Sequence, residues 1–162
     1  MADTMYAGLS FEQVVKAYNQ TVVSVCVMRL KNMNDAEDCF QNTFVRLYQK
    51  SPEFSDEEHL KAWLIRVAIN ECTSYIRKNR RTVSLSECKE QAVEFPHDDT
   101  DISWALMQLE DKYREVLFLY YIEKYKVNEI ADIVGRKPNT VKTLLSRGRE
   151  KLRTIYGGDS SE

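Results

Sequence analysis

The segment NTVKTLLSRGREKLR, residues 139–153, carries five basic residues and one acidic residue in a chain of 162 residues whose formal net charge is −2. At about 100° per residue, one side of a helix begun here would present apolar or small residues: Val141, Leu144, Leu145, Gly148, Leu152 and Ile155. The opposite side would present Lys142, Thr143, Ser146, Arg147 and Glu150, with Arg149 and Arg153 on one flank. This pattern predicts a helix that buries one face and exposes hydroxyls and cations on the other.

The residues before this helix complete a helix-turn-helix pattern. VNEIADIV, residues 127–134, predicts a short helix, and GRKP, residues 135–138, predicts a tight turn. Gly135 suits the positive φ that often follows a helix, and Pro138 suits the first turn of the next one. The small Ala131 would let the two helices cross closely.

A helix-turn-helix binds DNA by placing the exposed face of its second helix in the major groove. Lys142 and Arg147 can donate hydrogen bonds to guanine edges. Arg136, Lys137 and Arg149 suit phosphates, which set the register without reading sequence. Any amphipathic helix exposes a charged face, but the preceding helix and glycine turn favour DNA binding. The expected contact set is Arg136, Lys137, Asn139, Thr140, Lys142, Thr143, Ser146, Arg147 and Arg149.

Charge is distributed unevenly along the chain. Residues 136–153 contain seven basic residues and one acidic residue, and RKNRR, residues 77–81, adds four more positive charges. Between these patches, residues 86–101 contain six acidic residues and one basic residue. Two basic surfaces separated by an acidic connector indicate two nucleic-acid contacts on two bodies joined by a linker.

Three helices are expected in the first body. The first covers residues 11–31 with Ser10 as its N-cap, the second runs from a cap at Asn34 to Lys50, and the third runs from residue 56 or 57 to Arg80. Each has apolar residues three or four positions apart: Val14, Val15, Tyr18, Val22, Val25 and Cys26; Ala36, Phe40, Thr43, Phe44 and Leu47; Leu60, Trp63 or Leu64, Val67, Ala68 and Cys72. Polar residues of the second helix should face water, namely Glu37, Asp38, Gln41 and Asn42.

The overall prediction is an all-α protein with two small helical domains. Five glycines and three prolines are few for 162 residues, which favours helices over sheets. The domains are expected at residues 10–80 and 101–156, joined by a flexible acidic linker at 81–100 that shows no helical period. Besides the helix-turn-helix, the second domain should draw its core from two helices that meet near residues 110–111 and contribute Trp104, Leu106, Leu109, Tyr113, Val116, Leu117, Leu119 and Tyr120.

Several classes of protein are disfavoured. The four cysteines have neither metal-ligand nor C-x-x-C spacing, so we expect buried reduced thiols, no metal and no cofactor. No Gly-rich phosphate loop or nucleophile–base pattern points to an enzyme or to a small-molecule substrate. The N-terminus lacks a signal-peptide pattern, and no apolar run approaches the ~20 residues that span a bilayer. These observations favour a cytoplasmic protein.

Two longer stretches resemble the conserved modules of bacterial RNA polymerase sigma factors of the compact extracytoplasmic-function (ECF) group. DAEDCFQNTFVRLYQ, residues 35–49, with KAWLIRVAINECTSYIRKNRR, residues 61–81, resembles region 2. LEDKYREVLFLYYIEKYKVNEIADIVGRKPNTVKTLLSRGREKL, residues 109–152, resembles region 4. Both modules occur in the family's order and cover nearly the whole chain outside the linker and the tips. The resemblance implies a promoter-specificity subunit without catalysis of its own.

The resemblance to region 2 implies two contacts. The second helix would dock on the clamp coiled coil of the polymerase β′ subunit through Glu37, Asp38, Gln41 and Asn42, where Asn42 replaces a usual Glu. The third helix and the loop before it would open the minus-10 element, with Asn70 at the base-reading position. Five cations would hold the single strand: Lys61, Arg66, Arg77, Lys78 and Arg80. Trp63 is interpreted as a core residue.

The resemblance to region 4 implies that the helix starting at Pro138 reads the minus-35 element. Leu144 stands where the family often has an Arg, which agrees with its place on the apolar side. The implied partners are core RNA polymerase, through the β′ clamp and the β flap, promoter DNA, and an anti-sigma factor that would hold the protein at the membrane. The linker would thread toward the RNA exit path, where its negative charge would mimic nucleic acid.

Two alternative functions can be set against that of a sigma factor. A free-standing helix-turn-helix regulator, with the first body as a sensor or dimerisation domain, would bind duplex DNA tightly alone. A sigma factor should bind promoter DNA weakly until core polymerase is present. A helical enzyme or adaptor is disfavoured because the sequence carries no catalytic pattern.

Overall fold

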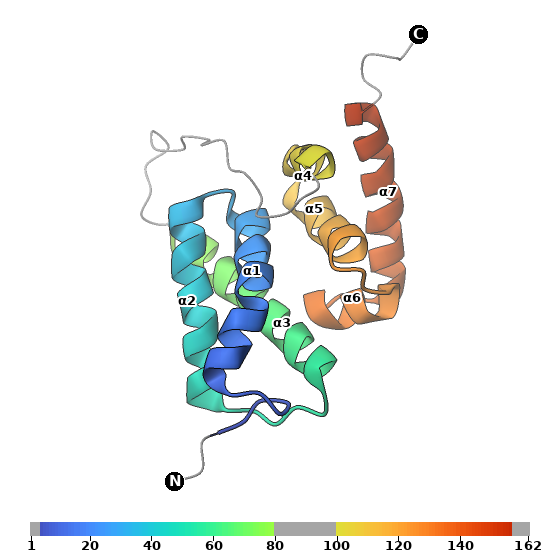
Figure 1. Ribbon diagram of the computed structural model, residues 1–162. Helices are drawn as coiled ribbons and strands as arrows, with labels where there is room; N and C mark the ends of the chain where they lie inside the picture. The colour runs from blue at the N-terminus through green and yellow to red at the C-terminus, as the bar shows by residue number, and fades with distance from the viewer. Residues whose placement is uncertain (1–3, 80–99, 157–162) are drawn as a thin grey trace. The chain divides into compact units, whose positions relative to one another are not determined.

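The computed structural model describes residues 4–79 and 100–156, and the regular secondary structure in these ranges is entirely helical, as predicted (Figure 1). The chain divides into two compact units, residues 1–96 and 97–162. The acidic linker expected at 81–100 lies outside the described residues except for Thr100, which begins helix α4.

The first unit is a bundle of three helices, each of which packs against the other two: α1 (Phe11–Leu30), α2 (Met33–Lys50) and α3 (Glu57–Asn79) (Figure 1). Ser10 caps α1 as predicted, because its Oγ accepts from the Gln13 backbone at 3.2 Å and Gln13 Oε1 accepts from the Ser10 backbone at 2.9 Å.

The predicted cap of the second helix was wrong by two residues. The N-cap is Asn32, whose Oδ1 accepts from the backbone N–H groups of Asn34 at 2.9 Å and Asp35 at 3.2 Å. Lys31 has a φ of 58°, which ends α1 abruptly and lets the next helix begin at Met33. Asn34 is therefore already inside the helix, where it cannot adopt the extended conformation that a cap requires.

The core of the first unit follows the predicted stripes with local shifts. Val14, Val22, Leu60 and Leu64 are among the residues that are fully buried. On α2, Cys39 is buried and Phe40 is only half-buried. On α3, Ile65 and Ile69 are buried in addition to the predicted residues. Both differences from the predicted stripes arise because each helix packs against two neighbours, which widens its buried side. Trp63 is half-buried, so its expected core role is only partly confirmed.

The second unit contains α4 (Thr100–Met107), α5 (Asp111–Leu117), a π-helical segment (Phe118–Ile122), α6 (Val127–Val134) and α7 (Pro138–Tyr156). Arg114 holds the connection before α5: it is 1% exposed, its Nη1 donates to the Leu109 carbonyl in that connection at 2.6 Å, and its Nη2 pairs with the carboxylate of Asp111, the first residue of α5. Trp104 was predicted in the core but is 60% exposed, because the short α4 buries Ala105 and Leu106 instead.

The helix-turn-helix is confirmed. Gly135 follows α6 with a φ of 70°, and its N–H donates to the Ala131 carbonyl at 2.9 Å. Pro138 is the first residue of α7, and the buried Ala131 lies on α6, which packs against α7. α7 also packs against α5, where Gly148 is buried and a Cβ at this position would lie 2.8 Å from Leu117 Cδ1. These contacts hold the inner side of α7 from Val141 to Gly148.

Candidate nucleic-acid interface and docking face

The outer face of α7 presents the polar residues that the sequence assigned to it. Val141, Leu144, Leu145 and Gly148 are buried on the inner side. Six predicted contact residues are exposed: Asn139, Thr140, Lys142, Thr143, Ser146 and Arg147. Thr143 Oγ1 donates to the Asn139 carbonyl at 3.1 Å, which fixes the orientation of that hydroxyl. The face therefore combines hydroxyls and cations on one rigid helix.

Arg136 and Lys137 occupy the turn immediately before α7, and both are exposed. The first turn of an α-helix carries unpaired backbone N–H groups and a partial positive charge. The two cations therefore add to a positive potential at the start of the exposed face, which favours an anion such as a phosphate.

Arg149 differs from the other predicted contacts because other side chains hold it. It is half-buried, its Nε donates to the Tyr121 hydroxyl at 2.7 Å, and its guanidinium lies 5.1 Å from the ring centre of Tyr120. Neither tyrosine was predicted as a neighbour of this residue. No sequence pattern links the π-helical segment to a position 28 residues later.

On α3, the predicted cations and Asn70 lie mostly in solvent. Arg66, Asn70, Arg77 and Lys78 are exposed, and Lys61 is half-buried. Arg66, Asn70 and Arg77 are spaced by four and seven residues, so they share one side of the helix. Arg80 lies outside the described residues. Most of the predicted minus-10 contact residues therefore lie on α3.

The loop before α3 is held by an aromatic cluster. The Phe54 ring lies 5.2 Å from that of His59 and 5.8 Å from that of Trp63, both edge to face. The Ser55 backbone N–H donates to His59 Nδ1 at 3.2 Å, and Asp56 Oδ1 accepts from the His59 backbone at 2.8 Å. These contacts fix the path of the chain into α3, and none of them was predicted from the sequence.

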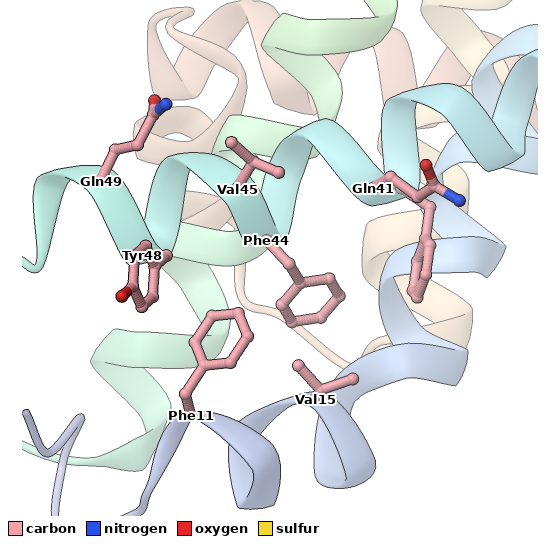
Figure 2. A pocket seen from close by; sticks show the side chains of 8 residues that line it. Phe11, Val15, Gln41, Phe44, Val45, Tyr48 and Gln49 are labelled. Carbon is pink, nitrogen blue, oxygen red and sulfur yellow. The ribbon is translucent and has the colours of Figure 1, made fainter. Parts of the chain in front are cut away.

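The predicted docking residues of α2 are all exposed: Glu37, Asp38, Gln41 and Asn42. Beside them lies a groove of about 550 Å³ between α1 and α2, which Gln41 also lines. Figure 2 shows Phe44 and Tyr48 of α2 pointing toward Phe11 and Val15 of α1. Tyr48 is 68% exposed, so the polar face continues into apolar surface that water contacts.

Three cysteines meet in the core of the first unit. Cys26, Cys39 and Cys72 come from three different helices, are buried, and form no disulfide. Hydrogen bonding to Cys72 and burial raise the pKa of the Cys39 thiol, while hydrogen bonding to Cys26 and burial raise the pKa of the Cys72 thiol. Protonated buried thiols are unreactive, which agrees with the predicted reduced state.

Two further properties concern the described residues as a whole. Within residues 4–79 and 100–156, no group of three or more His, Cys, Asp or Glu side chains is arranged to hold a metal ion. None of the helices in these ranges is both long enough and apolar enough to cross a bilayer.

Comparison with known proteins gives matches to both units. Residues 14–82 match the family model of Sigma-70 region 2, and residues 101–152 match that of Sigma-70, region 4. The chain is 30% identical to the ECF RNA polymerase sigma factor SigW of Bacillus subtilis, covering 89% of this chain and 87% of SigW. It is 29% identical to SigM of the same organism, covering 91% of this chain and 96% of SigM.

Among solved structures, the chain is similar to the sigma factor RpoE of Bartonella quintana, crystallised with the anti-sigma factor NepR. The TM-score is 0.74 with 26% identity, over 90% of this chain and 96% of that chain. CnrH, solved with the cytosolic domain of CnrY, gives a TM-score of 0.65 with 22% identity, over 92% of this chain and 88% of that chain, and shows the same fold.

Proposed function

This chain belongs to the ECF group of RNA polymerase sigma factors, and we propose that its two units divide promoter recognition between them. The second unit reads the minus-35 element through α7. The first unit opens and holds the minus-10 element through α3, while α2 docks on core polymerase. The observation that carries the proposal is the exposed face of α7, with its hydroxyls and cations behind the Gly135 turn.

Within the minus-35 contact, the roles of the side chains follow from their chemistry. Lys142 and Arg147 are exposed and can donate to the O6 and N7 acceptors of guanine. Thr143 and Ser146 can bond to bases or phosphates. The phosphate contacts that fix the register come from both ends of this face, namely Arg136, Lys137, Asn139, Thr140 and Arg149.

At the minus-10 element, α3 has to stabilise single-stranded DNA without an energy source. Unstacking a base costs a few kcal/mol, and a pocket for the flipped base together with backbone contacts offsets that cost. Asn70 is exposed on the same side as Arg66 and Arg77, so an amide that reads a base edge is flanked by cations that hold phosphates. Lys61, Lys78 and Arg80 extend the same contact.

Docking on core polymerase would use the α2 face and the neighbouring groove. Asp38 and Glu37 supply negative charge, Gln41 and Asn42 supply amides, and the β′ clamp coiled coil is a helical partner. A helix can bury its apolar residues in a groove such as the one lined by Phe11, Phe44 and Tyr48. Gln41 lines the groove and belongs to the polar face, so one partner can cover both.

The remaining partners and the cellular location follow from this role. The second unit would meet the β flap of the polymerase, and the protein would act in the cytoplasm, where core polymerase and DNA are found. An anti-sigma factor would restrain it there or at the membrane, as NepR forms a complex with RpoE. The protein has no catalytic activity of its own in this proposal.

The experiment that tests the proposal compares binding and transcription with and without core polymerase. Transcript 5′ ends mapped after overexpression supply a shared promoter pair, which serves as the probe. We expect the chain alone to bind the probe weakly, and the chain with core enzyme to form a specific complex that starts transcripts. Tight binding by the chain alone would indicate a free-standing regulator. Core enzyme that initiates identically with and without the chain would reject the proposal.

A further inference from the structure

Arg149 lies at the edge of the α7 face that the proposed function assigns to DNA. It follows Lys142 by seven residues and Ser146 by three, so it lies on the same side of the helix as both. Unlike those exposed residues, it is half-buried and packed against the π-helical segment. Its position is therefore set before any DNA is present.

The π-helical segment is what brings two consecutive tyrosines to this arginine. The Glu123 N–H donates to the Phe118 carbonyl at 3.2 Å, five residues back, which widens the turn relative to an α-helix. Tyr120 and Tyr121 are both half-buried, with ring centres 4.9 Å apart, and the guanidinium of Arg149 lies 5.1 Å from one ring centre and 5.7 Å from the other. π-helical turns inside α-helices occur frequently at functional sites.

The hydrogen bond between Arg149 and Tyr121 leaves both groups able to bind an anion. Arginine has five N–H donors, and within the described residues only Nε–H donates to another side chain, at 2.7 Å. The Nη–H donors can bind two oxygens of a phosphate. The Tyr121 oxygen accepts from Nε, so its own O–H can donate. An arginine that is already held loses little side-chain entropy on binding.

We propose that Tyr121 and Arg149 together bind one backbone phosphate of the promoter duplex, with the ring of Tyr120 supporting the guanidinium. This inference rests on the proposed minus-35 contact of α7, and it adds a residue outside the helix-turn-helix to that contact. Tyr121 donates to the phosphate and orients Arg149, while Tyr120 contributes only its ring.

The test uses full-length protein with core polymerase and a duplex promoter probe identified by transcript mapping. Binding constants are measured over a range of salt concentrations for the wild type, Tyr121→Phe, Arg149→Gln and the double variant. Tyr113→Phe is the matched control, because Tyr113 lies in the same unit but outside the proposed contact, and its hydroxyl makes no hydrogen bond within residues 4–79 and 100–156. Thermal melting of each variant monitors folding.

We expect Arg149→Gln to weaken binding by about tenfold and to reduce the slope of log K against log salt by about 0.9, as loss of one phosphate contact requires. Tyr121→Phe should weaken binding several-fold, by the same factor for probes with altered minus-35 bases, and should reduce the slope in the same direction. The double variant should bind more weakly than Arg149→Gln, but by a smaller factor than Tyr121→Phe loses in the wild-type background. Tyr113→Phe should bind like the wild type.

Three results would overturn the inference. The first is that Tyr121→Phe binds like the wild type. The second is that Tyr121→Phe weakens binding by the same factor in the wild-type and Arg149→Gln backgrounds. The third is that Tyr121→Phe or Arg149→Gln lowers the melting temperature but leaves the salt slope unchanged. Failure of the proposed function would appear separately, because the wild-type holoenzyme would then form no salt-sensitive promoter complex.

Discussion

The contact between α7 and α5 at Gly148 predicts that a single methyl group will disturb the second unit. A Cβ added to Gly148 would lie 2.8 Å from Leu117 Cδ1, 3.3 Å from Leu117 Cγ and 3.4 Å from Tyr113 Cβ. Real Cβ atoms essentially never approach another heavy atom to 2.8 Å. Leu117 is fully buried, so its side chain has little room in which to move away.

Two opposing terms set the size of the effect of Gly148→Ala. Replacing glycine by alanine inside a helix favours folding by about 1 kcal/mol. Forcing an extra methyl into a packed core costs about 1–3 kcal/mol. Because two atoms of Leu117 are crowded, we expect a net loss of about 1 kcal/mol in the free energy of unfolding, which for a unit of this size lowers the melting temperature by about 4–8 °C.

The decisive measurement repeats Gly148→Ala in a Leu117→Ala background. The crowding atoms are absent there, so only the helix-propensity term remains and the same substitution should stabilise by up to ~1 kcal/mol. Thermal melting of the full chain, followed by far-UV circular dichroism, measures the effect of the substitution in both backgrounds. Ser146→Ala, at an exposed position of the same helix, should stabilise by a few tenths of a kcal/mol in both backgrounds. If Gly148→Ala raises the melting temperature equally in both backgrounds, the close approach of α7 to α5 is wrong.

Three further predictions concern other sites. Arg147→Ala should cost ~1–3 kcal/mol at its cognate base pair and relax specificity there, as measured by holoenzyme binding to single-base variants of the minus-35 element; a uniform loss over all sequences would reassign Arg147 to a phosphate. Asp38→Ala should weaken core polymerase binding by about tenfold, whereas Glu58→Ala, at another exposed acid, should not; unchanged core affinity would exclude the α2 docking face. In a Cys88→Ser variant, the three buried thiols should not react with a disulfide reagent in the native state, even at mildly alkaline pH, because the pKa values of Cys39 and Cys72 are raised. All three thiols should react after denaturation. Fast labelling of the native protein would contradict this prediction.

The sequence was sufficient where the buried residues of a helix form one narrow stripe, as they do on α7 although it packs against both α5 and α6. The apolar residues of α7 recur at helical spacing, so the buried side with Leu144 and the exposed side with Arg147 could both be predicted. The turn could be predicted because Gly135 and Pro138 have backbone preferences that do not depend on distant contacts. These local preferences fix most of the proposed minus-35 surface.

The sequence was insufficient where the outcome depends on which residues of another helix come near. Periodicity could not choose between Phe40 and Cys39, because α2 packs against both α1 and α3 and buries more than a narrow stripe. Trp104 was predicted in the core because it is hydrophobic, although α4 is only eight residues long and has one buried side. The convergence of three thiols and the contact between Tyr121 and Arg149 both join residues far apart in the chain.

Arg147 and Arg149 of α7 carry the same charge but differ in how their side chains are packed. Arg147 is exposed and makes no hydrogen bond or ion pair with the described residues, so it can adjust to a base edge in the groove, at the cost of ordering a long side chain. Arg149 is already held by a hydrogen bond and two aromatic rings, so it binds with little ordering cost but cannot move to follow a different base. A held cation suits a phosphate, whose position is nearly independent of sequence, and a mobile one suits base recognition. The difference in packing thus predicts which arginine sets the register of α7 on DNA and which one reads the sequence.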